Sequence, residues 1–509
     1  MEVKRYLDLV RGAARRHPDK DAVVSPDGRV TFRELDSRVD RLGSALRAKA
    51  YATGSRVALL AANEVEYIEV QAACSRAGYT LVPLNTRLAK PELEYILRDC
   101  EPSILIAGRT EEKRVIELSA TVAGMELAGL GSPEQIEPYD ALLASGGSVV
   151  DEEDIAPNLT TTILYTSGTT GRPKGAMIVR QGMTTRVFVN ALELRAESSD
   201  VFVQSLPMFH IAAFLAYAYV FQGATVAMLP VFTPRDCLAT LQRERATATV
   251  LVPTMIQLVL NDPAIDSFDE SSLRLIIYGG ESIGPDVLRR AMERFNCGFH
   301  QQYGMTETGA QTILRPQDHD PSDPDVLSSA GSEAASFEIR IMDADDQPQP
   351  AGEAGEIACR GPAVMSGYWN LPEVTATTLR NGWMHTGDVG YRDQRGFLHI
   401  VDRKNDMIVT GGENVYPREV EQILLGHPEV ADCTVLGLPD PKWGEVVTAV
   451  VVEPSAPDHE LGAYLRERIA AYKVPKRWIR VDELPRNAAG KVLKAELRTQ
   501  LGNSSSKRE

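Results

Sequence analysis

The sequence lacks the features that mark secreted, zinc-binding and nucleic-acid-binding proteins. Its six cysteines have no CxxC spacing, which predicts reduced thiols and neither a disulfide framework nor a zinc site. The formal net charge of -16 argues against a nucleic-acid backbone as partner. No apolar segment follows Glu2, Lys4 and Arg5, and the polar tail at 504–509 lacks the peroxisomal tripeptide. We therefore expect a cytoplasmic protein that does not bind nucleic acid.

One segment is long enough to cross a bilayer and carries no charge. No Asp, Glu, Lys or Arg occurs between Val201 and Pro234. Prolines and polar residues such as His210 interrupt it, however. The interruptions predict a buried helix near 211–221 and a buried strand near 225–229, and no transmembrane segment.

The first part of the chain alternates between helical and strand patterns. Thr31 and Glu34 form a capping-box pair at the start of an amphipathic helix. Strand patterns and helical patterns then follow one another, and together they predict an α/β fold with largely parallel sheets and helices on both faces. The expected strands are at 56–60, 80–84, 103–107, 201–204, 225–229, 249–252 and 273–278, and the expected helices between the first three are at 64–77 and 91–99.

The texture of the sequence changes after about Ser336. Short β-like runs separated by Gly, Pro and Asp predict a small β-rich subdomain, with a strand at 337–341. Beyond a charged junction at 403–406, the patterns predict a compact α+β unit. Its expected helices are at 419–425 and 461–470, and its expected strands at 430–436 and 446–452.

A loop rich in glycine and hydroxyl residues follows the apolar segment 162–165 and ends at Lys174. Glycines let backbone N–H groups approach a polyanion, hydroxyls donate to its oxygens and lysine supplies charge, so the loop suits the phosphates of a nucleotide. It is not a P-loop, because no glycine directly precedes Lys174 and Gly175 follows it. Taken alone, such a loop could also be a polar, flexible hairpin.

The residue order from Tyr165 to Gly175 resembles the signature loop of the adenylate-forming, AMP-binding enzymes. This superfamily contains acyl-CoA synthetases, peptide-synthetase adenylation domains and firefly-type luciferases. Further matching blocks follow in order, so the resemblance covers essentially the whole chain. It implies an N-terminal AMP-binding domain at 1–403, a hinge at 404–406 and a small mobile C-terminal lid domain at 407–509. The further blocks are at 278–282, 302–309, 385–390, 411–414 and 485–493.

The resemblance also implies how the nucleotide is bound. Glu307 is a hard oxygen ligand suited to Mg²⁺, with Thr166 as a second metal contact. Tyr303 can stack on adenine, and Asp388 can accept the ribose hydroxyls. Alternatives remain, because Thr306 could simply cap a helix and Asp388 could be a turn residue. The implied ATP or AMP contacts are Thr166, Ser167, Gly168, Thr169, Thr170, Gly171, Lys174, Gly280, Glu281, Ser282, Gln302, Tyr303, Gly304, Thr306, Asp388 and Arg403.

The remaining blocks suggest catalytic and mobile parts. By resemblance, Lys491 is the catalytic lysine that bridges the substrate carboxylate and the α-phosphate, although a loop lysine is more often surface charge. Thr306, Glu307 and His210 complete the expected catalytic set. Asn405 matches the family's hinge position, where many relatives carry Asp or Lys. Gly411, Gly412 and Glu413 resemble the loop that lines the coenzyme A tunnel.

The acid pocket is expected around a phenylalanine and the residue after it. Amino-acid-activating relatives place Asp there, whereas this chain has His210, which argues against amino acids. No obvious cation lies in the pocket sequence, so an apolar monocarboxylate, fatty or aryl, is expected rather than a dicarboxylate. His210 could instead be a core histidine. The expected lining is Phe209, His210, Ile211, Phe214, Gly279, Gly304, Met305 and Gly309.

The resemblance therefore implies an ATP-dependent carboxylic acid–CoA ligase that uses ATP, Mg²⁺ and coenzyme A and forms an acyl-adenylate. A ligase that loads the pantetheine of a carrier protein, a luciferase-like oxygenase and an inactive nucleotide-binding sensor remain as alternatives. The expected partners are a small carboxylic acid and coenzyme A. The oligomeric state is open between a monomer and a homodimer.

Overall fold

The computed structural model describes residues 8–147, 155–166, 172–281, 283–403, 406–410, 413–440, 442–452, 456–486 and 492–505. The chain divides into two compact units, residues 1–338 with 359–384 and residues 339–358 with 385–509. Strands β17 (Glu338–Met342), β18 (Gly355–Arg360) and β21 (Trp383–Arg392) begin in one unit and end in the other.

The first unit contains a large mixed sheet in the order β16-β15-β14-β13-β12-β10-β11-β1-β2. Its central strands, from β1 and β11 to β14, run parallel, and both edges are antiparallel. The strands are β1 (Asp21–Ser25), β2 (Gly28–Thr31), β10 (Val201–Gln204), β11 (Thr225–Met228), β12 (Ala248–Leu251), β13 (Leu275–Gly279), β14 (Gly298–Met305), β15 (Gly309–Leu314) and β16 (Ser332–Glu333).

A second sheet of this unit has the order β19-β9-β8-β4-β3-β5-β6-β7. It is parallel from β8 to β7, and β9 and β19 are added antiparallel. The strands are β3 (Arg56–Leu60), β4 (Thr80–Leu84), β5 (Ile104–Ala107), β6 (Glu126–Gly129), β7 (Glu137–Pro138), β8 (Thr160–Thr166), β9 (Lys174–Val179) and β19 (Gly367–Tyr368).

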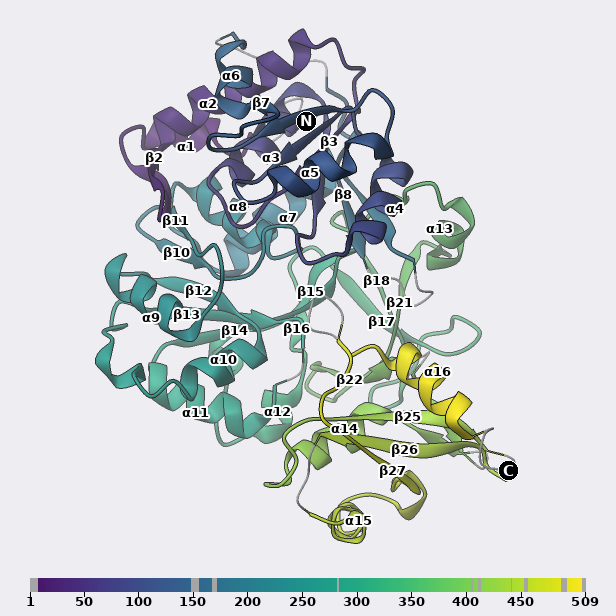
Figure 1. Ribbon diagram of the computed structural model, residues 1–509. Helices are drawn as coiled ribbons and strands as arrows, with labels where there is room; N and C mark the ends of the chain where they lie inside the picture. The colour runs from purple at the N-terminus through teal and green to yellow at the C-terminus, as the bar shows by residue number, and fades with distance from the viewer. Residues whose placement is uncertain are drawn as a thin grey trace. The chain divides into compact units, whose positions relative to one another are not determined.

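Helices cover both faces of both sheets, as the strand–helix alternation predicts (Figure 1). The main apolar core joins α2, α3, α7 and α8 to residues of both sheets, so these helices lie between them. A second core packs α9, α10 and α11 on the far face of the first sheet, and a third packs α4 and α5 on the second. The helices of this unit are α1 (Arg11–Arg16), α2 (Phe32–Ala48), α3 (Glu66–Ala77), α4 (Lys90–Cys100), α5 (Glu112–Leu118), α6 (Tyr139–Ala144), α7 (Arg180–Glu193), α8 (Ala213–Gln222), α9 (Pro234–Arg243), α10 (Pro253–Leu260), α11 (Pro285–Phe295), α12 (Pro324–Ser328) and α13 (Pro372–Thr378).

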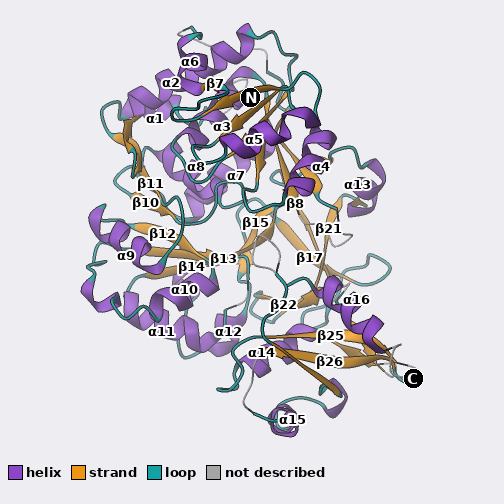
Figure 2. Cartoon of the chain, viewed as in Figure 1, coloured by secondary structure: helices purple, strands orange, loops and turns teal. Residues whose placement is uncertain are grey.

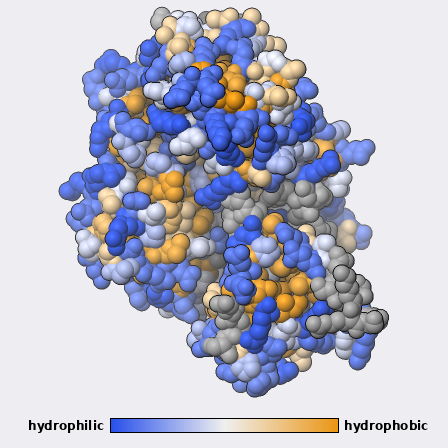
Figure 3. All heavy atoms as spheres, viewed as in Figure 1, coloured by the Kyte–Doolittle hydropathy of each residue, from blue (hydrophilic) through white to orange (hydrophobic). Residues whose placement is uncertain are grey.

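Local sequence signals explain why several of these elements begin where they do. The predicted capping box is confirmed, because the Thr31 side chain accepts from the N–H of Glu34 and the Glu34 carboxylate accepts from the N–H of Thr31. The uncharged segment 201–234 forms β10, the buried helix α8 and β11 rather than a membrane span. No helix among the described residues is long and apolar enough to cross a bilayer. The face drawn in Figure 3 carries mainly hydrophilic residues with scattered apolar patches.

The second unit contains the antiparallel pairing of β21 with β22 and a further sheet, β24-β23-β26-β25, to which β27 adds beside β26. Helices α14 and α16 pack against β25 (Figure 2). The elements are β22 (Leu398–Arg403), β23 (Ile408–Thr410), β24 (Glu413–Val415), α14 (Pro417–Leu425), β25 (Cys433–Asp440), β26 (Gly444–Val452), α15 (Asp458–Arg466), β27 (Arg477–Val481) and α16 (Lys494–Ser505).

Short strands complete the third sheet, whose order is β17-β18-β21-β20, with β20 at Leu379–Arg380. The α/β fold class with a small β-rich part and a compact C-terminal α+β part is thereby confirmed. All six cysteines are free thiols, and only Cys297 is not fully buried, so no disulfide is present.

Candidate active site

The two ends of the predicted phosphate loop lie side by side on adjacent strands. Thr166, the last residue of β8, pairs with Lys174, the first residue of β9, in an antiparallel hairpin. The loop thus connects two strands, unlike a P-loop, which leads from a strand into a helix. The Lys174 ammonium lies 5.3 Å from the centre of the Tyr368 ring. The loop residues Ser167, Gly168, Thr169, Thr170 and Gly171 lie outside the described residues.

A second group of predicted residues lies where the parallel strands of the first sheet end. Because β10, β13 and β14 belong to the parallel part of this sheet, the segments that follow them meet at one edge. Gly280, directly after β13, has a φ of +83°, which favours glycine. The exposed Glu281 carboxylate accepts a hydrogen bond from the Thr254 hydroxyl at 3.1 Å. Ser282 lies outside the described residues.

Gly279 is required by strand packing. A Cβ atom at this position would lie 2.2 Å from the carbonyl oxygen of Gln302 on the neighbouring strand. Gly304 is constrained in the same way, because its Cβ would lie 1.8 Å from the carbonyl oxygen of Gly309 across the hairpin. Both glycines were expected to leave room for a ligand. Close backbone contact gives a second reason why no side chain is present at either position.

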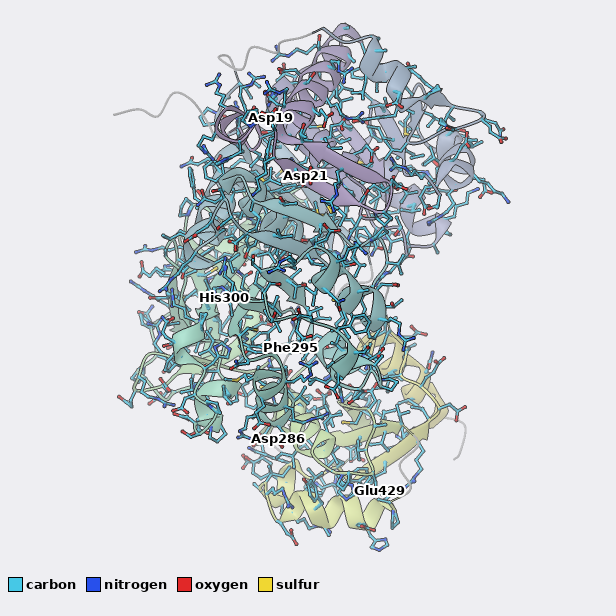
Figure 4. The ribbon with its side chains drawn as sticks, turned by 90° about the vertical axis from the view of Figure 1, so that its left-hand side faces the viewer. Asp19, Asp21, Asp286, Phe295, His300 and Glu429 are labelled. Carbon is cyan, nitrogen blue, oxygen red and sulfur yellow. The ribbon has the colours of Figure 1, made fainter. Side chains whose placement is uncertain are left out.

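Buried polar side chains support β14 from within the unit. Gln302 donates from Nε2 to Oδ1 of Asn190 on α7 at 3.0 Å. His300, labelled in Figure 4, is fully buried, and burial lowers its pKa to about 3, so its ring is neutral. On the adjacent strand β13, the Tyr278 hydroxyl hydrogen-bonds to Nε2 of His319 at 2.9 Å. Tyr303 is half-buried on β14.

Thr306 and Glu307 occupy the tight turn between β14 and β15, and Met305 ends the first of these strands. Thr306 therefore does not cap a helix, which removes the alternative reading of this motif. Gly309 completes the turn with a φ of +79°. Strands β14 and β15 carry this turn and hold the side chains of Thr306 and Glu307 at the carboxyl edge of the sheet.

Glu307 is 5% exposed and is held by two contacts from the segment before β19 and from β19 itself. The Tyr368 hydroxyl donates to Oε1 at 2.7 Å, and the Met365 N–H donates to the backbone oxygen of Glu307 at 2.7 Å. Within the described residues, Oε2 accepts no hydrogen bond. A carboxylate oxygen with no hydrogen-bond partner in the part of the chain that the structure describes fits Mg²⁺, which takes few protein ligands and keeps substrate phosphates and water. Thr166, the second expected metal contact, is half-buried, and its hydroxyl donates only a long bond of 3.5 Å to the Lys174 carbonyl.

Arg186 on α7 lies directly behind this turn, and the sequence analysis did not identify it. Its Nη1 donates to the carbonyl oxygen of Thr306 at 3.0 Å, and its Nε and Nη2 donate to that of Ala363 at 3.0 and 2.9 Å. The guanidinium lies 5.1 Å from the centre of the Phe214 ring. Burial lowers the pKa of Arg186 to about 9, and the Glu307 carboxylate opposes that shift, so the group remains a cation at neutral pH. The pocket sequence itself carries no cation, but a helix distant in the sequence supplies one near Phe214, and its guanidinium donates to the backbone carbonyls of Thr306 and Ala363.

Four of the predicted acid-pocket residues lie in the segment that links β10 to α8 or in that helix. Phe209 and His210 precede the helix with Ile211, and Phe214 is within it. The His210 ring contacts Phe209 edge-on at 4.7 Å, and burial lowers its pKa to about 4. Its Nε2 atom is buried without a hydrogen-bond partner among the described residues. His210 is therefore a neutral ring with an unused polar atom, which differs from a fully satisfied core histidine.

Asn63 holds the start of the segment between β10 and α8, and no pattern in the sequence predicted it. Its Oδ1 accepts from the N–H of Met208 at 2.8 Å, and its Nδ2 donates to the carbonyls of Leu206 and Leu229 at 2.9 and 3.0 Å. It comes from the loop before α3, far from the pocket in the sequence. One clue to Arg186 was present, namely a charged residue among the apolar positions of a helical segment. Asn63 and Tyr368 gave no such signal.

The second unit brings together two other predicted residues. Asp388 on β21 pairs in register with Arg403 on β22, and Arg403 Nε lies 2.9 Å from Asp388 Oδ1. The Thr386 hydroxyl accepts from the Asp388 N–H at 3.1 Å and donates to the Ile357 carbonyl at 2.7 Å. Asp388 is therefore a strand residue with a fixed backbone rather than an ordinary turn residue.

The structure describes one of the five remaining predicted residues of this unit. Glu413 begins β24 and is exposed. Asn405, Gly411, Gly412 and Lys491 lie outside the described residues. Their roles as hinge, tunnel and catalytic residues remain predictions.

Comparisons with known proteins agree with this arrangement. The family model "AMP-binding enzyme" matches residues 10–369, and "AMP-binding enzyme C-terminal domain" matches residues 419–491. The chain is 39% identical over 494 residues to a feruloyl-CoA synthase of an Amycolatopsis species, covering 96% of this chain and 97% of that one. It is 38% identical over 507 residues to an indoleacetate–CoA ligase of Aromatoleum aromaticum, covering 98% of both.

A solved structure shows the same fold over the same length. The amide bond synthetase McbA from Marinactinospora thermotolerans matches with a TM-score of 0.89 and 32% identity, covering 96% of this chain and 99% of that one. The family model alone spans well over half of the sequence. The chain belongs to the family of AMP-binding, adenylate-forming enzymes.

Proposed function

We propose that this protein is an ATP-dependent carboxylic acid–CoA ligase that forms an acyl-adenylate. The observation that carries the proposal is the Thr306–Glu307 turn, held at the carboxyl edge of a parallel sheet, with a carboxylate oxygen that has no partner among the residues that the structure describes. Two relatives that match over nearly their full length, one named as a CoA synthase and one as a CoA ligase, support the same activity. ATP, Mg²⁺ and coenzyme A are the corresponding substrates and metal.

The chemistry consists of two displacements. An oxygen of the acid's carboxylate attacks the α-phosphorus of ATP, the bond to the β-phosphate breaks, and pyrophosphate leaves. The thiol of coenzyme A then loses its proton, and the resulting thiolate attacks the acyl carbon. A thioester forms and AMP leaves. Positioning and electrostatic stabilisation dominate steps of this kind.

Residues of the chain receive roles in this scheme. Glu307 would hold Mg²⁺, which neutralises phosphate charge, and Lys174 and Thr306 would donate to phosphate oxygens. Asp388 would accept the ribose hydroxyls while Arg403 orients it, because the two side chains are already paired. Lys491 would stabilise the first transition state. For these steps we place the domain boundary at 403, the hinge at Asn405 and the lid at 407–509.

The acid is proposed to be an aryl or arylalkyl monocarboxylate. Phe209 and Phe214 supply aromatic surface, and His210 stays neutral because burial lowers its pKa to about 4. The two relatives carry names of aryl acids, which supports the aryl rather than the fatty choice. We further propose that the protein works in the cytoplasm.

The direct test is a pyrophosphate-release screen over aryl, arylalkyl and fatty acids, with and without coenzyme A. The expected result is acid-dependent release and a thioester detected by mass spectrometry. Release without a thioester, followed by product formation with an amine or a carrier protein, would instead support a different acceptor. The amine arm is included because an amide bond synthetase shares the fold. No release with any acid would refute the proposal.

A further inference from the structure

The turn that carries Glu307 is held by a short segment that lies much later in the sequence. We call residues 363–368 the strap. The Ala363 carbonyl accepts from Arg186, the Met365 N–H donates to the Glu307 carbonyl, and the Tyr368 hydroxyl donates to the Glu307 carboxylate. Arg186 bonds the carbonyls of Thr306 and Ala363 together, so it joins the turn to the strap.

Tyr368 also touches the phosphate hairpin. It lies in β19 and pairs with Ala176 of β9, two residues after Lys174. The Lys174 ammonium lies over its ring, at 5.3 Å from the ring centre. One 7% exposed side chain therefore contacts the lysine at the end of the phosphate loop with its ring and the Glu307 carboxylate with its hydroxyl.

The Tyr368 bond leaves Glu307 in a defined state. It occupies Oε1, so the carboxylate cannot rotate freely, and no other described residue bonds Oε2. A hydrogen bond that orients a metal-ligating carboxylate contributes to metal affinity although it never touches the metal. Because the carboxylate is already fixed by this bond, less conformational entropy is lost when Mg²⁺ binds.

We propose that Tyr368 is a positioning residue that fixes the Glu307 carboxylate for Mg²⁺ and links it to the phosphate hairpin through Lys174. Arg186 supports the same turn from the other side. This inference rests on the proposed function only in taking Glu307 as the metal contact.

The test compares Tyr368→Phe with a matched control. Tyr139→Phe removes another buried hydroxyl that donates to a carboxylate, Oε1 of Glu69, at the same 2.7 Å, in α6 and away from the site. Binding of ATP is measured by isothermal titration calorimetry at increasing Mg²⁺ and in EDTA, so that the result does not depend on turnover. Thermal unfolding of each variant shows whether it is folded.

For Tyr368→Phe, the Mg²⁺ concentration that gives half of the Mg²⁺-dependent gain in ATP affinity should rise about tenfold, the size expected when a bond to a charged group is lost. Affinity in EDTA should change less than about twofold, and Tyr139→Phe should leave both values unchanged. In a Glu307→Gln background, Tyr368→Phe should have no further effect, because the two residues act as one unit.

An unchanged Mg²⁺ requirement would overturn the inference, and so would an equal loss of affinity with and without Mg²⁺. An additive effect in the Glu307→Gln background would also overturn it. Pyrophosphate release by the wild type tests the proposed function separately, since that activity would persist even if Tyr368 had no such role.

Discussion

Asp402 caps helix α14 from the other side of the junction that contains Asn405. Its Oδ2 accepts the backbone N–H of Arg418 in the first turn of the helix at 2.8 Å, and its Oδ1 accepts the N–H of Arg403 at 2.6 Å. The helix has no capping side chain of its own at Tyr416. Burial raises the pKa of Asp402, and the nearby Lys494 ammonium opposes this shift. Rotation about Asn405 would therefore have to break this cap.

Asp402→Ala should weaken the arrangement described here by about 1 kcal/mol, the usual cost of replacing a helix cap by alanine, which corresponds to about fivefold in an equilibrium. The ratio of the adenylation rate to the thioester-forming rate should therefore change by up to about fivefold. Single-turnover assays of the two half-reactions measure it. Asp343→Ala is the control, because Asp343 also accepts two backbone N–H groups, those of Asp345 and Gln347, within a turn. The same ratio in both variants would contradict the prediction.

Lys491→Ala should reduce adenylation by orders of magnitude and leave conversion of preformed acyl-adenylate to the thioester largely intact. The reason is that the lysine charge is needed only while charge builds on the α-phosphate. Separate assays of the half-reactions check this. Lys113→Ala, an exposed lysine on α5, should leave both rates unchanged. Equal losses in the two half-reactions would rule out the assigned role.

Asn405→Pro should separate the half-reactions. Proline fixes φ near -65°, so a hinge that must change its torsions would be trapped in one arrangement. One half-reaction should survive while the other falls by orders of magnitude, whereas Asn405→Ala should retain both. Assays with ATP plus acid, and with acyl-adenylate plus coenzyme A, measure the two rates. Near-normal rates in both for the proline variant would place the pivot elsewhere.

His300 should make the protein less stable in acid. Its pKa is lowered to about 3 in the folded state, against about 6.5 when unfolded, so between these values only the unfolded chain binds the proton. Stability is therefore lost as the pH falls below 6.5, by about 2 kcal/mol at pH 5 from this one group. His300→Gln should remove that part of the pH dependence, measured by urea unfolding at pH 7 and pH 5. An identical loss of stability in both proteins would show that His300 does not titrate in this way.

Local patterns in the sequence determined most of the element order. Arg56–Leu60, Thr80–Leu84 and Val201–Gln204 are strands with the predicted bounds, because apolar runs of this length are buried on both faces of a parallel sheet. The residue order around Lys174 and Glu307 was enough to indicate the family. Element ends were less predictable in the C-terminal part. The strand expected at 430–436 is Cys433–Asp440, because its length is set by pairing with β26.

Only the tertiary structure decided which distant side chains meet. Tyr368 reaches Glu307 because β19 joins the edge of the second sheet beside β9, and strand pairing of that kind has no local signature. Arg186 and Asn63 bond backbone carbonyls and amides of other segments, so nothing in their own neighbourhoods identifies their partners. The sequence determined the chemistry that the site can offer, through residue types at fixed spacing. The packing of two sheets around shared helices determined which side chains position it, because those contacts depend on distances through space rather than along the chain.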